Sequence, residues 1–256
     1  MRLLITGARS GIGRHIHENL GGVAFMRETA DEVLHELKKE GTDVIIHCAF
    51  NSEKDISSKS LYRYFHDNIM LTDKIVSIPH KKFIFFSTVD IYPKNYEMHR
   101  EDEVISADNV DGIYAVTKLI SESIVKKRCS DYLIMRPTTL VGRYSRKNTL
   151  LRIIEEYNGD LHLSGNSMFN YVLHSDVLDF IKFSIKKDIQ GTYNIASSDN
   201  IKLSEVASSL DRTVHFGHHL YSVGNISNSK VTSVFPALNK SSQSVLHQFT
   251  EEYARV

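Results

Sequence analysis

The amino-acid sequence predicts an α/β fold in which a doubly wound parallel sheet carries helices on both faces. Three observations predict it. Short apolar runs alternate with helical patterns over the first three-quarters of the 256 residues, an order typical of parallel sheets. The runs VIIHC (44–48) and FIFF (83–86) do not alternate with polar residues, as expected for strands buried on both faces. A glycine-rich turn follows the first run.

The expected elements follow one another in regular order. Strands are predicted at six apolar runs: Arg2–Thr6, Val23–Met26, Val44–Cys48, Phe83–Ser87, Tyr132–Arg136 and Thr192–Ala196. Helical patterns fall between them, at Gly11–Leu20, Ala30–Glu40, Leu61–Val76, Tyr114–Arg128, Leu150–Tyr157 and Asp176–Lys187. Beyond residue 200 the pattern is less regular, because HFGHHLYSVGNISNSK (215–230) has the polar, glycine-containing character of a loop. A weak helical period returns at Ser241–Tyr253.

Composition excludes several classes of protein. Lys+Arg and Asp+Glu both total 31, so the chain lacks the basic balance of a nucleic-acid binder. Two cysteines, Cys48 and Cys129, cannot form a disulfide framework and are typical of a reducing compartment. The apolar runs are too short for a membrane span or a signal peptide. We therefore expect a cytoplasmic protein without a membrane partner.

The histidines of HFGHH are the one candidate metal cluster. His215, His218 and His219 lie close together in the sequence, but no cysteine lies nearby to complete a set of three or four ligands. We therefore expect a polar surface loop here and no metal site.

The turn in LLITGARSGIG (3–13) carries the first functional signal. Gly7 permits a tight turn, Gly11 lets backbone N–H groups approach a pyrophosphate, and Gly13 permits close packing of helix on sheet. An ordinary strand–helix turn is the alternative. Because the turn follows the first strand of an alternating chain, we interpret it as the dinucleotide-binding turn of a Rossmann-type sheet.

Two arginines indicate which dinucleotide is bound. The acidic residue that commonly follows the second strand is absent; Arg27 stands just past VAFM, and Arg9 lies inside the glycine loop. A carboxylate would hold a ribose diol, whereas guanidinium groups suit a 2′-phosphate. Solvated surface charges are the alternative reading. The pattern favours NADP (NADPH) over NAD.

The segment YAVTK places Tyr114 and Lys118 one turn apart on a predicted helix, hence on one face. A phenol with a pKa of about 10 is a poor proton donor or base at neutral pH. A neighbouring ammonium lowers that pKa, and the hydroxyl of Thr88, at the end of FIFFST, could hold a substrate oxygen. An exposed helix pair is the alternative, since Tyr-x-x-x-Lys is frequent by chance. The order of glycine loop, Ser-Thr strand end and this helix favours a catalytic set.

This order of motifs resembles the extended short-chain dehydrogenases/reductases, the NAD(P)-dependent epimerase/dehydratase proteins that act on nucleotide-sugars. The matching stretches are ITGARSGIG, VIIHCAF, FIFFSTVDIYP, YAVTK, MRPTTLVGR, NYVLHSDVLDFI and GTYNIAS, over residues 1–200. NSKVTSVFPAL and the helix after it resemble the usual ending of the family. The resemblance therefore covers nearly the whole chain.

The resemblance implies residue roles at the matching positions. Thr88, Tyr114 and Lys118 would be catalytic, and Asn68 would help to organise the site. The cofactor-binding positions are Gly7, Arg9, Ser10, Gly11, Ile12, Arg27, Cys48, Ala49, Phe50, Ser87, Tyr114, Lys118, Pro137 and Thr138. The substrate-binding positions are Thr88, Val89, Asp90, Arg143 and Arg146, with ordinary loop charge as the alternative for the two arginines.

The chain also departs from the family pattern. Ser10 stands where extended members usually carry a glycine, so the glycine spacing is that of the single-domain branch. Dehydratases follow the catalytic Thr with an Asp-Glu pair, but Val89 and Asp90 follow it here, so 4,6-dehydration is not expected. The family arginine that contacts the substrate nucleotide is replaced by Phe169, which leaves the nucleotide open.

The stretches VAFMRETAD and STVDIYPK also resemble GDP-fucose synthases. Those enzymes epimerise through a Cys and a His, whose positions correspond here to Val89 and Tyr144. Without an acid/base pair at carbon, simple reduction of a carbonyl group remains.

These observations lead to one expected function and two alternatives. We expect an NADPH-dependent reductase of a keto-sugar, foremost a 4-keto-6-deoxy nucleotide-sugar, with Tyr114 as the proton donor. The alternatives are an NAD-dependent nucleotide-sugar C4 epimerase and a non-catalytic protein that senses the cofactor. Residues 1–142 plus 171–200 would bind the cofactor, and 143–170 plus 201–256 the substrate. The resemblance also implies a homodimer through Leu61–Val76 and Tyr114–Arg128.

Overall fold

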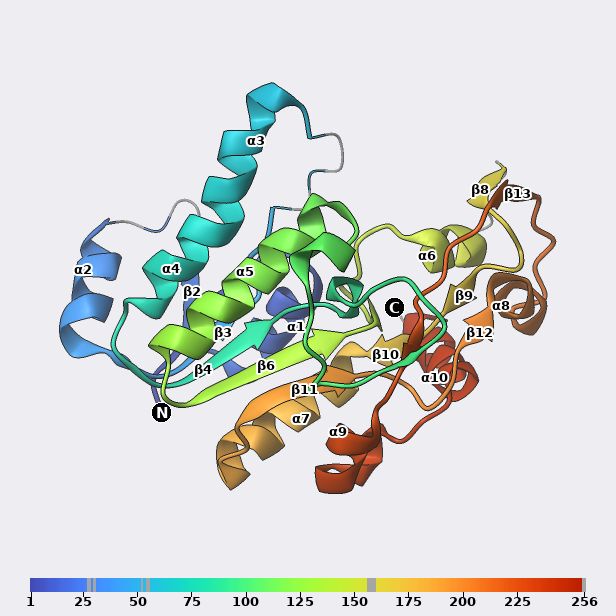
Figure 1. The fold of residues 1–256 in the computed structure, drawn as a ribbon. Coiled ribbons are helices and arrows are strands. Elements are labelled where there is room, and N and C mark those ends of the chain that lie inside the picture. Colours follow the sequence, from blue (N-terminus) through green and yellow to red (C-terminus); the bar gives the residue numbers. More distant parts are fainter. Residues whose placement is uncertain (27–28, 30, 52, 54–55, 156–159, 255–256) are drawn as a thin grey trace.

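The computed structural model describes residues 1–26, 29, 31–51, 53, 56–155 and 160–254, and its centre is a six-stranded parallel sheet (Figure 1). All six predicted strands are present, each within a few residues of its expected bounds. They are β1 (Leu3–Thr6), β2 (Val23–Phe25), β3 (Thr42–His47), β4 (His80–Phe86), β6 (Tyr132–Pro137) and β11 (Gly191–Ile195). The predicted α/β class with a Rossmann-type sheet is confirmed.

The strand order is β2-β1-β3-β4-β6-β11. The chain runs from β1 outward to β2, returns to β3 on the other side of β1, and continues in that direction to β11. The sheet is thus doubly wound, and the order reverses between β1 and β3. In such sheets a crevice opens at this point, beyond the carboxyl ends of the strands. Thr6 and His47, the last residues of β1 and β3, pair in register there.

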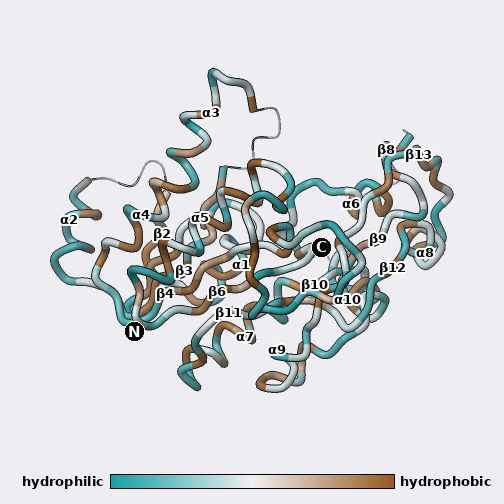
Figure 2. Tube along the Cα trace, in the orientation of Figure 1, coloured by the Kyte–Doolittle hydropathy of each residue, from teal (hydrophilic) through white to brown (hydrophobic). Residues whose placement is uncertain are grey.

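Helices cover both faces of the sheet because alternate strand residues point to opposite sides. Leu3 and Ile5 face α1 (Gly11–Leu20), α7 (His174–Lys187) and α9 (Ser229–Val234). Leu4 faces the other side, which carries α2 (Asp31–Glu40), α4 (Leu71–Val76) and α5 (Gly112–Arg128). Figure 2 shows the apolar residues gathered along the strands between these two layers.

The helix expected over Leu61–Val76 consists of three pieces. It starts earlier, as α3 (Ser58–Phe65), passes through the π-helical turn η1 (His66–Met70) and ends as α4. A π-helical turn inserts one residue into the i→i−4 ladder, and such turns are frequent at functional sites. Hydrophobic spacing alone does not reveal this insertion. The turn contains Asn68, which the resemblance singled out.

A smaller portion with its own core lies beside the sheet (Figure 1). Short strands pair within it or link it to neighbouring loops: β7 (Thr139–Val141) with β10 (Tyr171–Leu173), β8 (Leu161–Leu163) with β13 (Phe216–His219), β9 (Met168–Phe169) with β12 (Ile201–Lys202), and β5 (Met98–His99) with β14 (Asn225–Ile226). The remaining helices are α6 (Thr149–Ile154), α8 (Leu203–Ser209) and α10 (Ser242–Ala254), with short 3-10 turns η2 (Val89–Ile91), η3 (Ala107–Asn109) and η4 (Pro236–Leu238).

Two details differ from expectation in this portion. HFGHH is not a loop, because Phe216–His219 forms β13; Gly217 lies so close to β8 that an added Cβ would be 2.4 Å from the His162 carbonyl oxygen. In addition, Val231 and Leu238 pack in the core of the sheet, although 201–256 was assigned to the substrate-binding portion. The division into two portions otherwise stays a prediction.

Candidate active site

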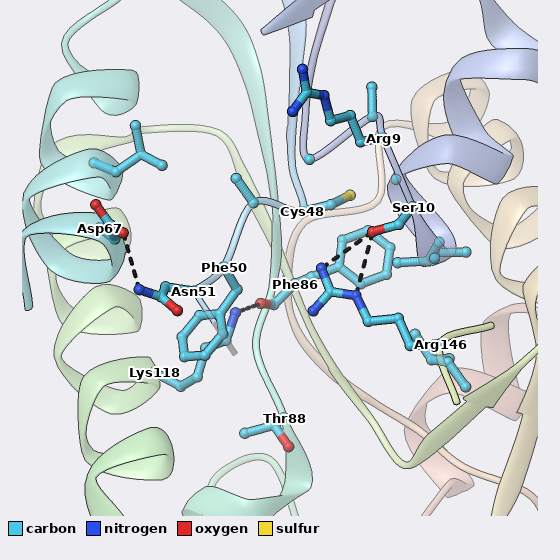
Figure 3. A pocket seen from close by; sticks show the side chains of 18 of the residues that line it. Arg9, Ser10, Cys48, Phe50, Asn51, Asp67, Phe86, Thr88, Lys118 and Arg146 are labelled. Atoms are coloured by element: carbon cyan, nitrogen blue, oxygen red, sulfur yellow. Dashed lines mark hydrogen bonds between the residues drawn. The ribbon is translucent and has the colours of Figure 1, made fainter. Parts of the chain in front are cut away.

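A cavity of about 980 Å³ opens at the carboxyl ends of the central strands, where the strand order reverses. It is bounded by the glycine loop, the segments after β3, β4 and β6, and α5 (Figure 3). Its walls contain most of the predicted cofactor-binding residues: Gly7, Arg9, Ser10, Gly11, Ile12, Cys48, Ala49, Phe50, Ser87, Tyr114, Lys118, Pro137 and Thr138. Thr88 and Arg146, predicted at the substrate, line it as well.

The glycine loop is pressed against the segment that follows β3. Gly7 has φ +73°, and a Cβ at this position would lie 2.8 Å from the Ala49 backbone nitrogen, so another residue would be both strained and crowded. A Cβ on Gly13 would lie 2.4 Å from the Gly7 carbonyl oxygen. The loop therefore directs the start of α1 toward the cavity. Within the described residues, the N–H groups of Ile12 and Gly13 have no hydrogen-bond acceptor.

A buried hydrogen-bonded chain holds β1, β3 and η1 together behind the cavity. The Thr6 hydroxyl accepts bonds from the Cys48 and Ala49 amides at 3.1 and 2.9 Å, and it lies 2.7 Å from His47 Nδ1. His47 Nε2 lies 3.0 Å from the hydroxyl of Thr72, which donates to the Asn68 carbonyl at 2.7 Å. Burial lowers the pKa of His47 to about 3, so the ring is neutral and structural.

Thr88 follows the end of β4 and is buried at the cavity wall. Its hydroxyl caps the short η2 turn by accepting a 3.2 Å bond from the Asp90 amide, and it also lies 3.2 Å from an Asp90 carboxylate oxygen. That carboxylate is paired with Lys94 Nζ at 2.8 Å. The side-chain oxygen of Thr88 is thereby held at a defined position on the wall that Tyr114 also lines.

Tyr114 and Lys118 lie one turn apart on α5 and both line the cavity, as their spacing predicted. Burial raises the pKa of Tyr114 above its ordinary value; Asp90 adds to this effect, and a hydrogen bond to Thr88 opposes it. The expected lowering of this pKa by Lys118 is therefore wrong for the structure, because burial outweighs it. The Lys118 ammonium donates a 2.6 Å bond to the Phe86 carbonyl and lies 4.4 Å from the centre of the Phe50 ring. Burial lowers the pKa of Lys118 to about 7.

A buried ion pair supports α5 one further turn along. Glu122 accepts bonds from Arg136 Nε and Nη2 at 2.9 and 2.8 Å, and both side chains are almost wholly buried. Arg136 Nη1 also donates to the Tyr92 hydroxyl at 2.7 Å, and that hydroxyl donates to Asn194 at 2.8 Å. Burial acts to raise the pKa of Glu122, but Arg136 outweighs it and holds the pKa below its usual range.

Asn68 positions the cavity wall and does not itself line the cavity. Its side-chain oxygen accepts a 2.7 Å bond from the Asn51 amide, and its side-chain nitrogen lies 3.3 Å from the Asn51 carbonyl. These bonds fasten the segment Cys48–Asn51 to the π-helical turn. The organising role that the resemblance implied thus has a structural basis in this segment.

Three predicted substrate-binding residues lie away from the cavity wall, and Arg27 lies outside the described residues. The side chain of Val89 is buried in a small cluster with Tyr92, which corrects the expectation of a contact at the cavity. Asp90 is paired with Lys94 beside Thr88. Arg143 is exposed and its guanidinium lies 5.6 Å from the Tyr144 ring centre.

Arg146 lies beside the glycine loop, and its assignment to the substrate phosphates stays a prediction. Its Nε and Nη2 atoms donate to the Ser10 hydroxyl at 3.3 and 3.2 Å (Figure 3). The hydroxyl of Tyr144 is bonded to Glu18 on α1, so it points away from the cavity. These contacts hold the loop after β7 against α1. The sequence alone does not reveal them, because the two segments lie far apart in the chain.

Sequence reasoning missed one whole wall of the cavity. Asp67, Met70, Leu71 and Lys74 line it from η1 and α4, and Asn51 Nδ2 donates to Asp67 at 3.0 Å (Figure 3). Their spacing of three or four residues places them on one helical face, a signal that could have found them. At the end of the cavity nearest β2, the lining residues include three apolar side chains, those of Phe25, Met26 and Leu34.

The described residues contain neither a metal site nor a membrane-spanning helix. No group of His, Cys, Asp or Glu side chains in these parts of the chain is placed to hold a metal ion. No helix in the same ranges is long and apolar enough to cross a bilayer.

Solved structures with the same fold belong to nucleotide-sugar enzymes. A dTDP-4-dehydrorhamnose reductase from Bacillus anthracis, in complex with NADP, matches with a TM-score of 0.81 and 19% identity, covering 98% of this chain and 99% of that one. A UDP-glucuronic acid 4-epimerase from Bacillus cereus, in complex with NAD, matches with a TM-score of 0.79 and 20% identity, covering 100% and 99%. Identities this low establish the fold alone.

Sequence comparison defines the family. The human dTDP-D-glucose 4,6-dehydratase is 24% identical over 185 residues, which are 67% of this chain and 52% of the relative. The chain thus spans about half the length of the curated relatives it matches. The model of the NAD dependent epimerase/dehydratase family matches residues 3–196. The family assignment is confirmed: this chain belongs to the NAD dependent epimerase/dehydratase family.

Proposed function

We propose that this protein is an NADPH-dependent reductase of a keto-sugar, foremost of a 4-keto-6-deoxy nucleotide-sugar. The observation that carries the proposal is the meeting of Thr88, Tyr114 and Lys118 at one end of a single cavity. The glycine loop, with Arg9 and Arg146, forms another wall of that cavity. A proton donor and a binding site for a phosphate-bearing cofactor thus share one cavity. The solved structures with this fold support the substrate class, since their names refer to nucleotide-sugars.

The residues present fit a nicotinamide dinucleotide. Among the described residues, no acceptor is bonded to the N–H groups of Ile12 and Gly13 at the start of α1, and these groups suit a pyrophosphate. Gly7 permits the close approach of the loop to Ala49. Apolar side chains at the β2 end of the cavity suit an adenine ring, and Phe25 is among them. When bound, the reduced cofactor would supply the hydride that enters the carbonyl carbon.

The charge of the residues that line the cavity favours NADPH. Arg9 lines the cavity within the glycine loop, where a guanidinium can hold a 2′-phosphate. The acidic lining residue Asp67 lies toward α4, on the other side of the view in Figure 3, and is bonded to Asn51. It is therefore not placed to repel a phosphate beside Arg9.

The chain's own residues perform the acid chemistry. Tyr114 is protonated at neutral pH, because even the ordinary pKa of a phenol lies well above 7. It gives that proton to the substrate oxygen as the carbonyl becomes an alcohol. The Thr88 hydroxyl orients that oxygen. Lys118 would stabilise the resulting phenolate and would hold the nicotinamide ribose, as the family resemblance implies. Solvent then returns the proton to Tyr114.

Dehydration, and epimerisation at a sugar carbon other than the carbonyl carbon, would need acid or base side chains at positions where this chain carries other residues. The position after Thr88 that bears an acid in dehydratases and a Cys in GDP-fucose synthases is the buried Val89. The position that bears a His in the latter is Tyr144, which is bonded to Glu18 outside the cavity. Reduction of the carbonyl needs neither group.

The test is whether turnover of a 4-keto-6-deoxy nucleotide-sugar requires added reductant. We expect one NADPH to be oxidised for each alcohol formed, and no conversion without NADPH. Interconversion of C4 epimers by protein that retains NAD, without added reductant, would instead identify an epimerase. Binding of the cofactor without turnover of any keto-sugar would identify a cofactor-sensing protein.

We also propose that the chain forms a homodimer through α3, η1, α4 and α5. The described residues on these elements include exposed apolar side chains, among them Tyr62, Met70 and Ile120. Light scattering at micromolar concentration should yield the mass of two chains; the mass of one chain would refute the proposal.

A further inference from the structure

The segment 143–147 lies across the glycine loop, although it follows β7 and leads into α6 of the smaller portion. The Gly11 amide, the first of α1, donates a 2.9 Å bond to the Tyr144 carbonyl. Arg146 donates to the hydroxyl of Ser10, the residue that precedes the helix, at 3.2 and 3.3 Å. Two residues of the segment thus contact two consecutive residues of the loop.

Further contacts fix the conformation of this segment. The Tyr144 hydroxyl is bonded to Glu18, and the Arg14 guanidinium lies 4.3 Å from the Tyr144 ring centre. On the other side, the Ser145 hydroxyl accepts a 2.8 Å bond from the Gly142 amide, and the Ser145 amide donates to the Gly142 carbonyl at 2.9 Å. Ser145 and Arg146 are therefore presented to the cavity, which both line.

The position of Arg146 matches the part of α1 that remains open to an anion. The Gly11 amide already donates to the Tyr144 carbonyl, and the Arg14 amide donates to the Ser10 carbonyl at 3.3 Å. Among the described residues, Ile12 and Gly13 keep their amides available at the same helix start. A guanidinium beside Ser10 places a positive charge next to these amides, and positive charge together with backbone N–H groups suits a phosphate group.

We propose that Arg146 binds the pyrophosphate of the cofactor and that segment 143–147 holds it there. The inference rests on the proposed function, since it requires a dinucleotide in this cavity. It also separates the two arginines: Arg146 contacts a group common to NADPH and NADH, whereas Arg9 contacts the 2′-phosphate that NADPH alone carries. A residue expected at the substrate thereby becomes part of the cofactor site.

Calorimetric titration of Arg146→Gln with NADPH and with NADH tests the inference. We expect both affinities to fall by the same factor, about 10- to 100-fold, because a charge-assisted contact to a shared group is lost. Arg146→Lys should recover part of the loss, since it restores the charge without the planar donors. Arg128→Gln is the matched control: this exposed arginine pairs with Asp73 outside the cavity, and both affinities should stay unchanged.

Other titration results would contradict either the role of Arg146 or the proposed function. A loss confined to NADPH would assign Arg146 to the 2′-phosphate, and unchanged affinities would make it a surface charge; either result overturns this inference and leaves the proposed function intact. Wild-type protein that binds neither dinucleotide would refute the proposed function itself. Thermal melting of each variant without cofactor separates lost affinity from lost folding, because a contact to the ligand leaves the melting temperature of the free protein unchanged.

Discussion

Lys118 Nζ donates a 2.6 Å hydrogen bond to the carbonyl oxygen of Phe86, the last residue of β4. The bond ties α5 to the strand end that continues into Thr88, so it sets the spacing between the two walls that carry Tyr114 and Thr88. It also keeps an ammonium in a site where burial lowers its pKa to about 7. The predicted chemistry therefore depends on a charge that the fold accommodates at a cost in stability.

Lys118→Met should stabilise the fold and remove activity. The substitution replaces a buried ammonium by an apolar side chain of similar length, so we expect the free energy of unfolding at pH 7 to rise by about 1–4 kcal/mol. Turnover should be lost, because the phenolate of Tyr114 would have no neighbouring cation. Denaturant unfolding and a turnover assay on the same sample check both effects. A fall in stability would contradict this account of Lys118.

The stability difference between wild type and Lys118→Met should also depend on pH. The pKa of Lys118 is about 7 in the folded protein and 10.5 in the unfolded chain, so the unfolded chain binds more protons between these values. The free energy of unfolding of the wild type therefore rises relative to that of the variant as pH rises from 7 toward 10. Below pH 7 the difference between the two is constant. Unfolding series over this range check it; a difference independent of pH would show that Lys118 keeps an ordinary pKa.

Thr88→Val should lower turnover more than it lowers substrate affinity. Valine has a similar shape but cannot orient the substrate oxygen, so we expect kcat to fall by about 10- to 100-fold. Thr88→Ser keeps the hydroxyl and serves as the matched control, with kcat within a few-fold of wild type. Steady-state kinetics at saturating NADPH measure both variants. Equal kcat values for Thr88→Val and wild type would remove Thr88 from the mechanism.

Breaking the buried pair of Glu122 and Arg136 should destabilise the protein strongly. Glu122→Gln leaves the Arg136 guanidinium buried without its counter-charge, and such a loss costs about 3–5 kcal/mol. The double variant Glu122→Gln/Arg136→Met removes both charges and should recover much of that loss. Arg128→Gln, in an exposed pair with Asp73, should change stability by less than about 1 kcal/mol. Denaturant unfolding of each variant measures these changes. A double variant that is destabilised by more than the summed destabilisations of Glu122→Gln and Arg136→Met alone would contradict this reasoning.

Arg9→Gln should weaken the binding of NADPH and leave the binding of NADH unchanged. Loss of a charge-assisted contact to the 2′-phosphate is worth about 10- to 100-fold in affinity, and NADH has no such group. Titration with both cofactors measures the ratio of their affinities, which should approach one in the variant. A wild-type protein that already prefers NADH would show that Arg9 is a surface charge and would move the epimerase to the first place among the functions.

The sequence predicted those parts that local chemistry determines. The strands β3 and β4 contain the uninterrupted apolar runs VII (44–46) and FIFF (83–86). The glycine loop is recognisable because only glycine tolerates the approach of Gly7 to Ala49. Tyr114 and Lys118 meet because helical spacing places them on one face, and Thr88 joins them because it follows the adjacent strand β4. Parallel strands bring these carboxyl ends to the same edge of the sheet.

The remainder depended on contacts between distant segments. Arg146 reaches Ser10 only because Tyr144 packs on α1, more than a hundred positions earlier in the chain. Strand β13 was missed because its one apolar residue, Phe216, does not produce an alternating pattern. The π-helical turn was missed because its inserted residue, within the expected helix, does not disturb the hydrophobic period enough to be seen.

The most direct test of the account follows the hydride itself. A 4-keto-6-deoxy nucleotide-sugar is incubated with NADPH that carries deuterium at both positions of the nicotinamide C4, and the product is analysed by mass spectrometry and NMR. The account predicts one deuterium at C4 of the product sugar. It also predicts a loss of about 10²- to 10⁴-fold in rate for Tyr114→Phe, with NADPH affinity unchanged. A product without deuterium, or a Tyr114→Phe variant as active as wild type, would contradict it.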